Sequence, residues 1–111
     1  MSNWREALDR EFKWAAEARS RKNEGRARVC ARRAAGIAIR EHLPRRGIRP
    51  PSSSSLDLLH NLEMDGSLPA EIRQAVQRLT MRVDHEFNLP LEAYLIAEAR
   101  SLCRWLLPDW E

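Results

Sequence analysis

The residues of this chain best suited to chemistry lie close together in the stretch "RLTMRVDHEF", residues 78 to 87. Arg78 and Arg82 can neutralise phosphate charge, because a guanidinium group forms paired hydrogen bonds with phosphate oxygens. His85 titrates near neutral pH, so it can exchange a proton with a ribose hydroxyl or a leaving oxygen. The pattern predicts a site that binds nucleotide or RNA phosphate through Arg78 and Arg82, with Arg78 and His85 as catalytic candidates and no need for a metal ion.

Helical spacing separates this stretch into two faces. If one helix runs continuously from residue 69 to about residue 86, its core stripe consists of Ile72, Val76, Leu79 and Val83. Arg78, Arg82 and His85 then form a second stripe about 130° from the first, facing solvent or a partner. Met81 lies beside that stripe as an exposed apolar residue. Two ordinary explanations stay open: a solvated face in which Arg82 pairs with Glu86, and compensation of the helix dipole.

Other kinds of site find little support in the sequence. Cys30 and Cys103 lack the spacing of a zinc site or a disulfide framework, so we expect reduced core residues. The serine-rich stretch "PPSSSSL" has no glycine-lysine phosphate loop, and we expect no cofactor and no metal ligands. His42 and His60 are more consistent with structural or surface roles, His42 as a cap for carbonyls at the end of its helix.

Composition favours a single all-α domain over residues 1–111. The chain has 43% apolar residues and only four glycines, as in soluble helical proteins. Its longest apolar run, residues 34 to 39, is far shorter than the ~20 residues that span a bilayer, and the charged N-terminus does not resemble a secretory signal. We therefore expect a cytoplasmic protein.

Residues 1–49 carry a net charge of +8 and residues 50–111 a net charge of −5. This difference indicates either complementary charge between packed helices or a phosphate-binding surface.

The pattern predicts an up-and-down bundle of four longer helices and one short helix. Asn3 caps a first helix that ends near Arg19, and a second helix with an alanine face runs from about Arg26 until Pro44 stops it. Residues 44–55 form a mobile loop rich in proline and serine. A short serine-capped helix ended by Gly66, the helix from residue 69 and a last helix over residues 91–107 complete the bundle.

In the order and spacing of these segments the chain resembles the HEPN family of small helical domains, which are associated with nucleotides and RNA. The stretch "ARVCARRAAGIAIREHL" is similar to the family's second helix, "SSSSLDLLHNL" to its short helix and "AEARSLCRWL" to its last helix. The resemblance implies a homodimer of helical bundles, often paired with a minimal nucleotidyltransferase, and in many members a metal-independent ribonuclease toxin of a toxin-antitoxin pair.

The family's signature is an arginine, four to six residues and a histidine at the dimer cleft, which Arg78 and His85 match at its upper limit. Two positions depart from it: Leu79 stands where a polar residue usually follows the arginine, and Gly36 stands where an acid often joins the site. The alternatives are a non-catalytic adaptor that binds a nucleotidyltransferase, and nucleic-acid binding by the basic N-terminal half alone, with an affinity that falls steeply with salt.

Overall fold

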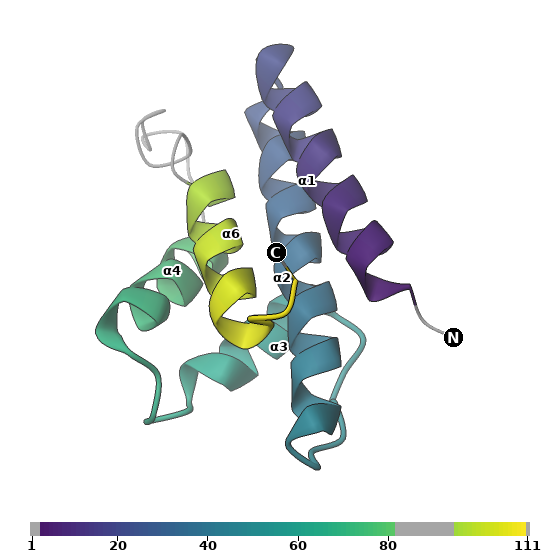
Figure 1. Cartoon of the computed structure of the whole chain (residues 1–111). Helices are drawn as coiled ribbons and strands as arrows, with labels where there is room; N and C mark the ends of the chain where they lie inside the picture. Colours follow the sequence, from purple (N-terminus) through teal and green to yellow (C-terminus); the bar gives the residue numbers. More distant parts are fainter. Residues whose placement is uncertain (1–2, 82–94, 111) are drawn as a thin grey trace.

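The computed structural model describes residues 3–81 and 95–110, and these residues form an all-α structure without strands. The prediction of an all-α bundle is therefore confirmed. Figure 1 shows the five helices that the structure describes. They are α1 (Trp4–Ser20), α2 (Glu24–Arg45), α3 (Ser55–Glu63), α4 (Ala70–Thr80) and α6 (Leu95–Leu106).

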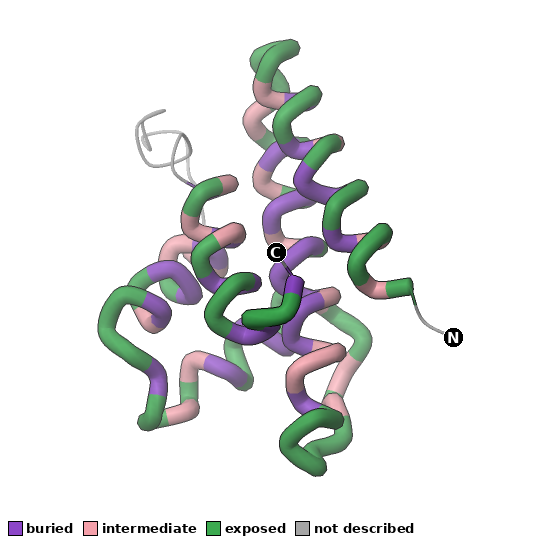
Figure 2. The backbone as a smooth tube through the Cα atoms, viewed as in Figure 1, coloured by how far each residue is buried: buried purple, intermediate pink, exposed green. Residues whose placement is uncertain are grey.

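Helix α2 is the central element, and it contacts each of the other described helices. It forms an antiparallel hairpin with α1, while α6 packs against both α2 and α4, and α3 lies across the lower end of α2 (Figure 1). Figure 2 shows that one side of α2 is buried along the helix, and most of its buried residues are small. Its buried small residues are Ala27, Cys30, Ala31, Ala34, Ala35, Gly36 and Ala38. The predicted alanine face is thus confirmed, and it lets neighbouring backbones approach closely.

The N-termini of three helices are capped by side chains, and the caps of α1 and α3 are those that the sequence predicts. The Asn3 side chain accepts a hydrogen bond from the backbone N–H of Glu6 at the start of α1, and Ser54 accepts one from Asp57 at the start of α3. Asn23 caps α2 in the same way. These side chains satisfy N–H groups that have no partner within the helix.

Three predicted helix ends are wrong, those of α2, α3 and α4. Helix α2 continues through Pro44 to Arg45, and it ends there because Gly47 adopts a left-handed conformation with φ +74°. The N–H groups of Gly47 and Ile48 then bond to carbonyls of Pro44 and Leu43, which is a Schellman motif. The segment between α2 and α3 is therefore residues 46–54, and its predicted mobility stays a prediction.

Helix α3 ends at Glu63, three residues before Gly66. The guanidinium group of Arg73 on α4 donates to the carbonyl oxygens of Glu63 at 2.7 Å and Asp65 at 2.6 Å. A side chain from the next helix thus takes the role that we had assigned to a glycine, and it ties α4 to the end of α3.

The residues after α6 fold back onto the hairpin of α1 and α2. The ring of Trp110 stacks on Phe12 with centroids 5.3 Å apart, and its Nε1 donates to Asp9 at 2.9 Å. Asp109 forms ion pairs with Arg5 at the start of α1 and Arg45 at the end of α2. This C-terminal segment therefore ties together three helices by stacking and charge.

The two cysteines agree with the prediction, and the last helix agrees with it except at Trp105, which was expected to be available for burial. Cys30 and Cys103 are buried and free, and none of the described helices combines the length and apolarity needed to cross a membrane. On α6, Leu95, Ala99 and Leu102 are buried, whereas Trp105 is exposed. Residues 91–94, which the sequence placed at the start of the last helix, lie outside the described residues.

The contact at Gly36 gives a stability prediction. A Cβ at this position would lie 2.2 Å from Oγ, 2.8 Å from Cβ and 3.1 Å from Cα of Ser55, so the start of α3 would have to move. Overpacking of this kind costs about 1–3 kcal/mol, which outweighs the ~1 kcal/mol that alanine gains over glycine in a helix. We expect Gly36→Ala to lower the free energy of unfolding in urea. Gly25→Ala on the same helix is the control, because only Asn23 Oδ1 lies within 4.0 Å of its Cβ, and it should not destabilise the protein. A Gly36→Ala variant as stable as Gly25→Ala would contradict the packing.

The ion pairs of Asp109 give a pH prediction. The hydrogen bond from Arg45 is the main cause that lowers the pKa of the Asp109 carboxyl below its ordinary value of about 4. A lowered folded-state pKa stabilises the protein above the unfolded pKa, and this contribution is lost as pH falls through the folded value. Asp109→Asn should therefore lower Tm at pH 7, and its difference from the wild type should shrink below pH ~4. Glu71→Gln, an exposed change on α4, should leave the pH profile nearly unaltered. A constant difference at all pH values would rule out the charge contribution.

Candidate functional site

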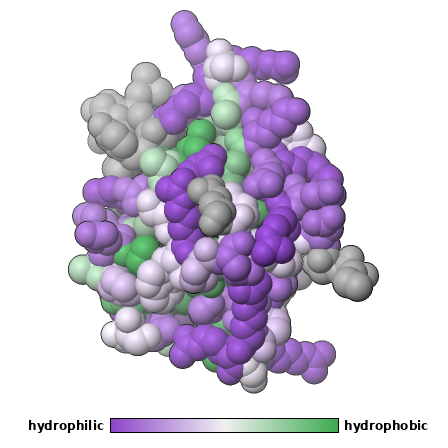
Figure 3. All heavy atoms as spheres, in the orientation of Figure 1, coloured by the Kyte–Doolittle hydropathy of each residue, from purple (hydrophilic) through white to green (hydrophobic). Residues whose placement is uncertain are grey.

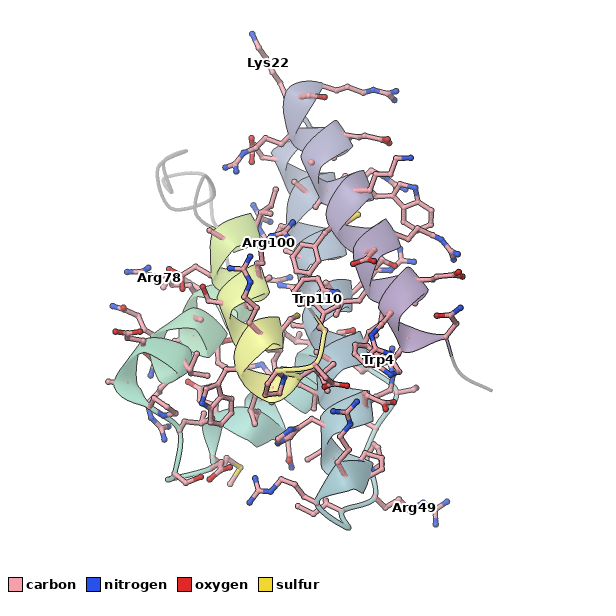
Figure 4. The ribbon with its side chains drawn as sticks, viewed as in Figure 1. Trp4, Lys22, Arg49, Arg78, Arg100 and Trp110 are labelled. Carbon is pink, nitrogen blue, oxygen red and sulfur yellow. The ribbon has the colours of Figure 1, made fainter. Side chains whose placement is uncertain are left out.

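Arg78 lies in the last turn of α4, where its Nη1 forms an ion pair with Oε1 of Glu98 on α6. The Arg78 side chain is 31% exposed and the Glu98 side chain 18% exposed, so the pair sits at the edge of the bundle (Figure 4). A guanidinium group carries five N–H donors. Those of Nε and Nη2 make no hydrogen bond with any described residue. Among the described residues, Glu98 thus holds one edge of the guanidinium group, and the donors of Nε and Nη2 have no partner there.

The other two members of the predicted site, Arg82 and His85, lie outside the described residues. The helix that was expected to carry them does not extend that far, because α4 ends at Thr80 and Met81 is extended, with φ −63° and ψ 132°. The prediction of one continuous helix over residues 69–86 is wrong at this point. Helical spacing therefore does not place Arg78, Arg82 and His85 on one stripe.

The core side of α4 agrees with the prediction, as Ile72, Val76 and Leu79 are buried. Val83, the fourth member of the predicted stripe, lies outside the described residues. Met81 is half-buried instead of exposed. Leu79 thus follows Arg78 as a core residue, and a polar side chain at this position would have to enter the apolar interior.

Arg32 on α2 holds the end of α4. Its Nε donates to the carbonyl oxygen of Leu79 at 2.6 Å and its Nη2 to that of Met81 at 3.1 Å. Burial, and then the charge of Arg28, lower the pKa of Arg32. Sequence analysis missed this residue, because its partners are backbone atoms 47 and 49 positions away.

Gly36, where the family resemblance suggests an acid, is buried against Ser55. The space at this position does not hold even a methyl group without movement of α3. Close packing against the start of α3 therefore explains the glycine at this position.

His42 and His60 contact other residues of the protein, and Cys30 and Cys103 are buried. Nδ1 of His42 lies 3.1 Å from the carbonyl oxygen of Leu106, so His42 contacts the end of α6 and not its own helix as expected. His60 on α3 lies 3.8 Å from Glu63.

Burial raises the pKa of Cys30 and raises that of Cys103 to about 12, so both thiols stay protonated at neutral pH. Within residues 3–81 and 95–110, no three His, Cys, Asp or Glu side chains are grouped to hold a metal ion.

A cleft of about 270 Å³ lies between α4 and α6 next to the Arg78–Glu98 pair. Its lining residues are Glu71, Ile72, Gln74, Ala97, Glu98 and Ser101. The two carboxylates make this cleft unfavourable for a phosphate, because like charges repel. A phosphate that binds Arg78 must therefore approach the side of the guanidinium group that faces away from Glu98.

Comparison of the chain with known proteins finds no matching family model, no similar curated protein and no similar solved structure.

The two hydrogen bonds of Arg32 give a testable prediction for the end of α4. Arg32→Ala removes both and leaves two partly buried carbonyls without this donor, so we expect a loss of about 1–3 kcal/mol in the free energy of unfolding. Arg32→Lys should recover only part of it, since an ammonium group lacks the planar fork that reaches both oxygens. Arg26→Ala, which removes an exposed arginine from the same helix, should change stability by less than ~0.5 kcal/mol in the same urea titration. Equal stabilities for Arg32→Ala and Arg26→Ala would exclude a capping role.

Proposed function

We propose that this chain is a HEPN-like domain that binds nucleotide or RNA phosphate through Arg78 and Arg82 in the cleft of a homodimer. The proposal rests on the contacts of Arg78. Glu98 holds one edge of its guanidinium group, and the N–H groups of Nε and Nη2 make no hydrogen bond with a described residue. A charged donor held in a fixed orientation binds phosphate without first losing its conformational freedom. Arg82 and His85 follow within seven positions of the chain.

The proposed chemistry is metal-independent cleavage of RNA, as the family resemblance implies. Arg78 would stabilise the negative charge that develops on the phosphorus-bound oxygens when a ribose 2′-hydroxyl attacks the adjacent phosphate. His85 would transfer the proton, either from the hydroxyl or to the leaving oxygen. A dimer would bring two copies of these residues to one cleft. No cofactor takes part in this scheme.

The test is a paired binding and cleavage assay with RNA in the presence of EDTA. We expect the wild type to cleave, His85→Ala to bind but not cleave, and Arg78→Ala to bind at least tenfold more weakly, since charge-assisted hydrogen bonds contribute about 1.5–3 kcal/mol.

Glu98→Ala is the matched control, because it breaks the same ion pair and keeps the guanidinium group. If Glu98→Ala and Arg78→Ala weaken binding equally, the effect comes from the contact between α4 and α6 and not from phosphate binding. Equal cleavage by the wild type and His85→Ala would remove His85 from the mechanism. Absence of cleavage, together with a stable complex with a minimal nucleotidyltransferase in gel filtration, would support the adaptor alternative.

A further inference from the structure

A second cleft lies at the turn between α1 and α2, at the end of the hairpin where Lys22 projects (Figure 4). It has a volume of about 250 Å³. Its lining residues are Trp14, Glu17, Ala18, Arg21, Asn23 and Arg26. Trp14 is only half-buried, so part of an aromatic ring is open to a ligand at this cleft. The volume is below the range of about 300–1,000 Å³ that encloses cofactors, which favours contact with one part of a longer molecule.

Positive charge is concentrated at this end of the hairpin. Residues 10–28 contain seven basic and three acidic side chains. Arg21, Lys22 and Arg26 are exposed, and their side chains form no ion pair with a residue that the structure describes. Figure 3 shows hydrophilic side chains projecting from this end of the molecule, with less polar residues between them. Arg10 adds a further charge beside the ring of Trp14, at 6.0 Å from its centroid.

Lys22 occupies a backbone conformation that favours glycine. Its φ is +60°, and it ends α1 in a Schellman motif, with Lys22 N–H bonded to Arg19 and Asn23 N–H bonded to Ala18. At the end of α2 the same position is filled by Gly47. A lysine in the left-handed region is strained, whereas glycine is not. Lys22 therefore places a charged side chain at a position where glycine would be less strained.

The turn itself is well held, so the cleft is formed before any ligand binds. Asn23 Oδ1 accepts a hydrogen bond from the N–H of Arg26 at 3.2 Å, and the N–H of Arg21 bonds to the carbonyls of Glu17 and Ala18. The charged side chains therefore project from a fixed backbone around Trp14.

We propose that this cleft binds single-stranded nucleic acid, with a base stacked on Trp14 and backbone phosphates bound by Arg21, Lys22 and Arg26. An aromatic side chain next to a basic groove is the combination by which proteins bind single strands with little sequence preference. Glu17 can accept a hydrogen bond from a base amino group at the same place. The site shares no residue with the one proposed around Arg78, and it stands independently of the function proposed there.

The test is fluorescence anisotropy with a labelled oligouridylate of about ten nucleotides, measured across a series of salt concentrations. All variants are made in the Arg78→Ala background, so that binding at the Arg78 site does not contribute to the signal. We expect Trp14→Ala to weaken binding about tenfold. We expect Lys22→Gly to weaken it about threefold and to reduce the slope of log affinity against log salt by about 0.7, as for the loss of one phosphate contact.

Two controls separate binding from folding. Lys22→Gly relieves the strained backbone, so it should bind less strongly while its Tm is unchanged or higher. Arg49→Ala removes one exposed charge at the opposite end of the bundle, and Trp105→Ala removes an exposed tryptophan from α6; neither should change the affinity (Figure 4).

The proposal is overturned if the Arg78→Ala protein does not bind the oligonucleotide. It is equally overturned if Trp14→Ala and Lys22→Gly bind as tightly as their parent, or if Arg49→Ala weakens binding as much as Lys22→Gly does. Annealing the oligonucleotide to its complement hides the faces of its bases, so the effect of Trp14→Ala should then disappear. A Trp14→Ala effect of the same size on the duplex would exclude base stacking.

Discussion

Close packing around α2 is the constraint on which the other contacts of this bundle depend. A helix whose buried side carries alanine and glycine lets neighbouring backbones approach, so one helix can contact α1, α3, α4 and α6 at once. At Gly36 the start of α3 occupies the space where a side chain would lie. Small side chains contribute little hydrophobic area themselves. Helix α2 adds Ile39 and Leu43, and the other helices supply further large core residues, among them Leu58, Leu79 and Leu102.

Several arginines of this chain hold its helices together. Arg32 and Arg73 donate to carbonyl oxygens at the ends of α4 and α3, and Arg45 joins α2 to the C-terminal segment. The planar guanidinium group suits this task because it can reach two oxygens at once. Much of the positive charge of the N-terminal half is therefore structural. The exposed charges of Arg21 and Lys22 are concentrated at one end of the hairpin, around a half-buried tryptophan.

Sequence analysis identified the elements better than the site. The caps at Asn3 and Ser54 and the alanine face of α2 depend on residues within one or two turns of each other, and all three were correctly predicted. The predicted end of α4 was wrong. The apolar spacing through Val83 favours a longer helix, and only a contact from Arg32, which is distant in sequence, shows where the helix ends. The partnership of Arg78 with Glu98 was not visible for the same reason, since it joins two helices.

The sequence by itself determined that this chain is helical, where most of its helices begin and which faces they bury, because hydrophobic periodicity and capping act over a few residues. The tertiary structure decided which arginines bond to other described residues of the protein. It also decided where α3 and α4 end. Those outcomes depend on atoms that are far apart in the chain, such as the guanidinium group of Arg73 and the carbonyl oxygen of Glu63. A local pattern places a charged side chain on a helix face. Only the packing of the helices decides whether that side chain bonds to another part of the protein or is available to a ligand.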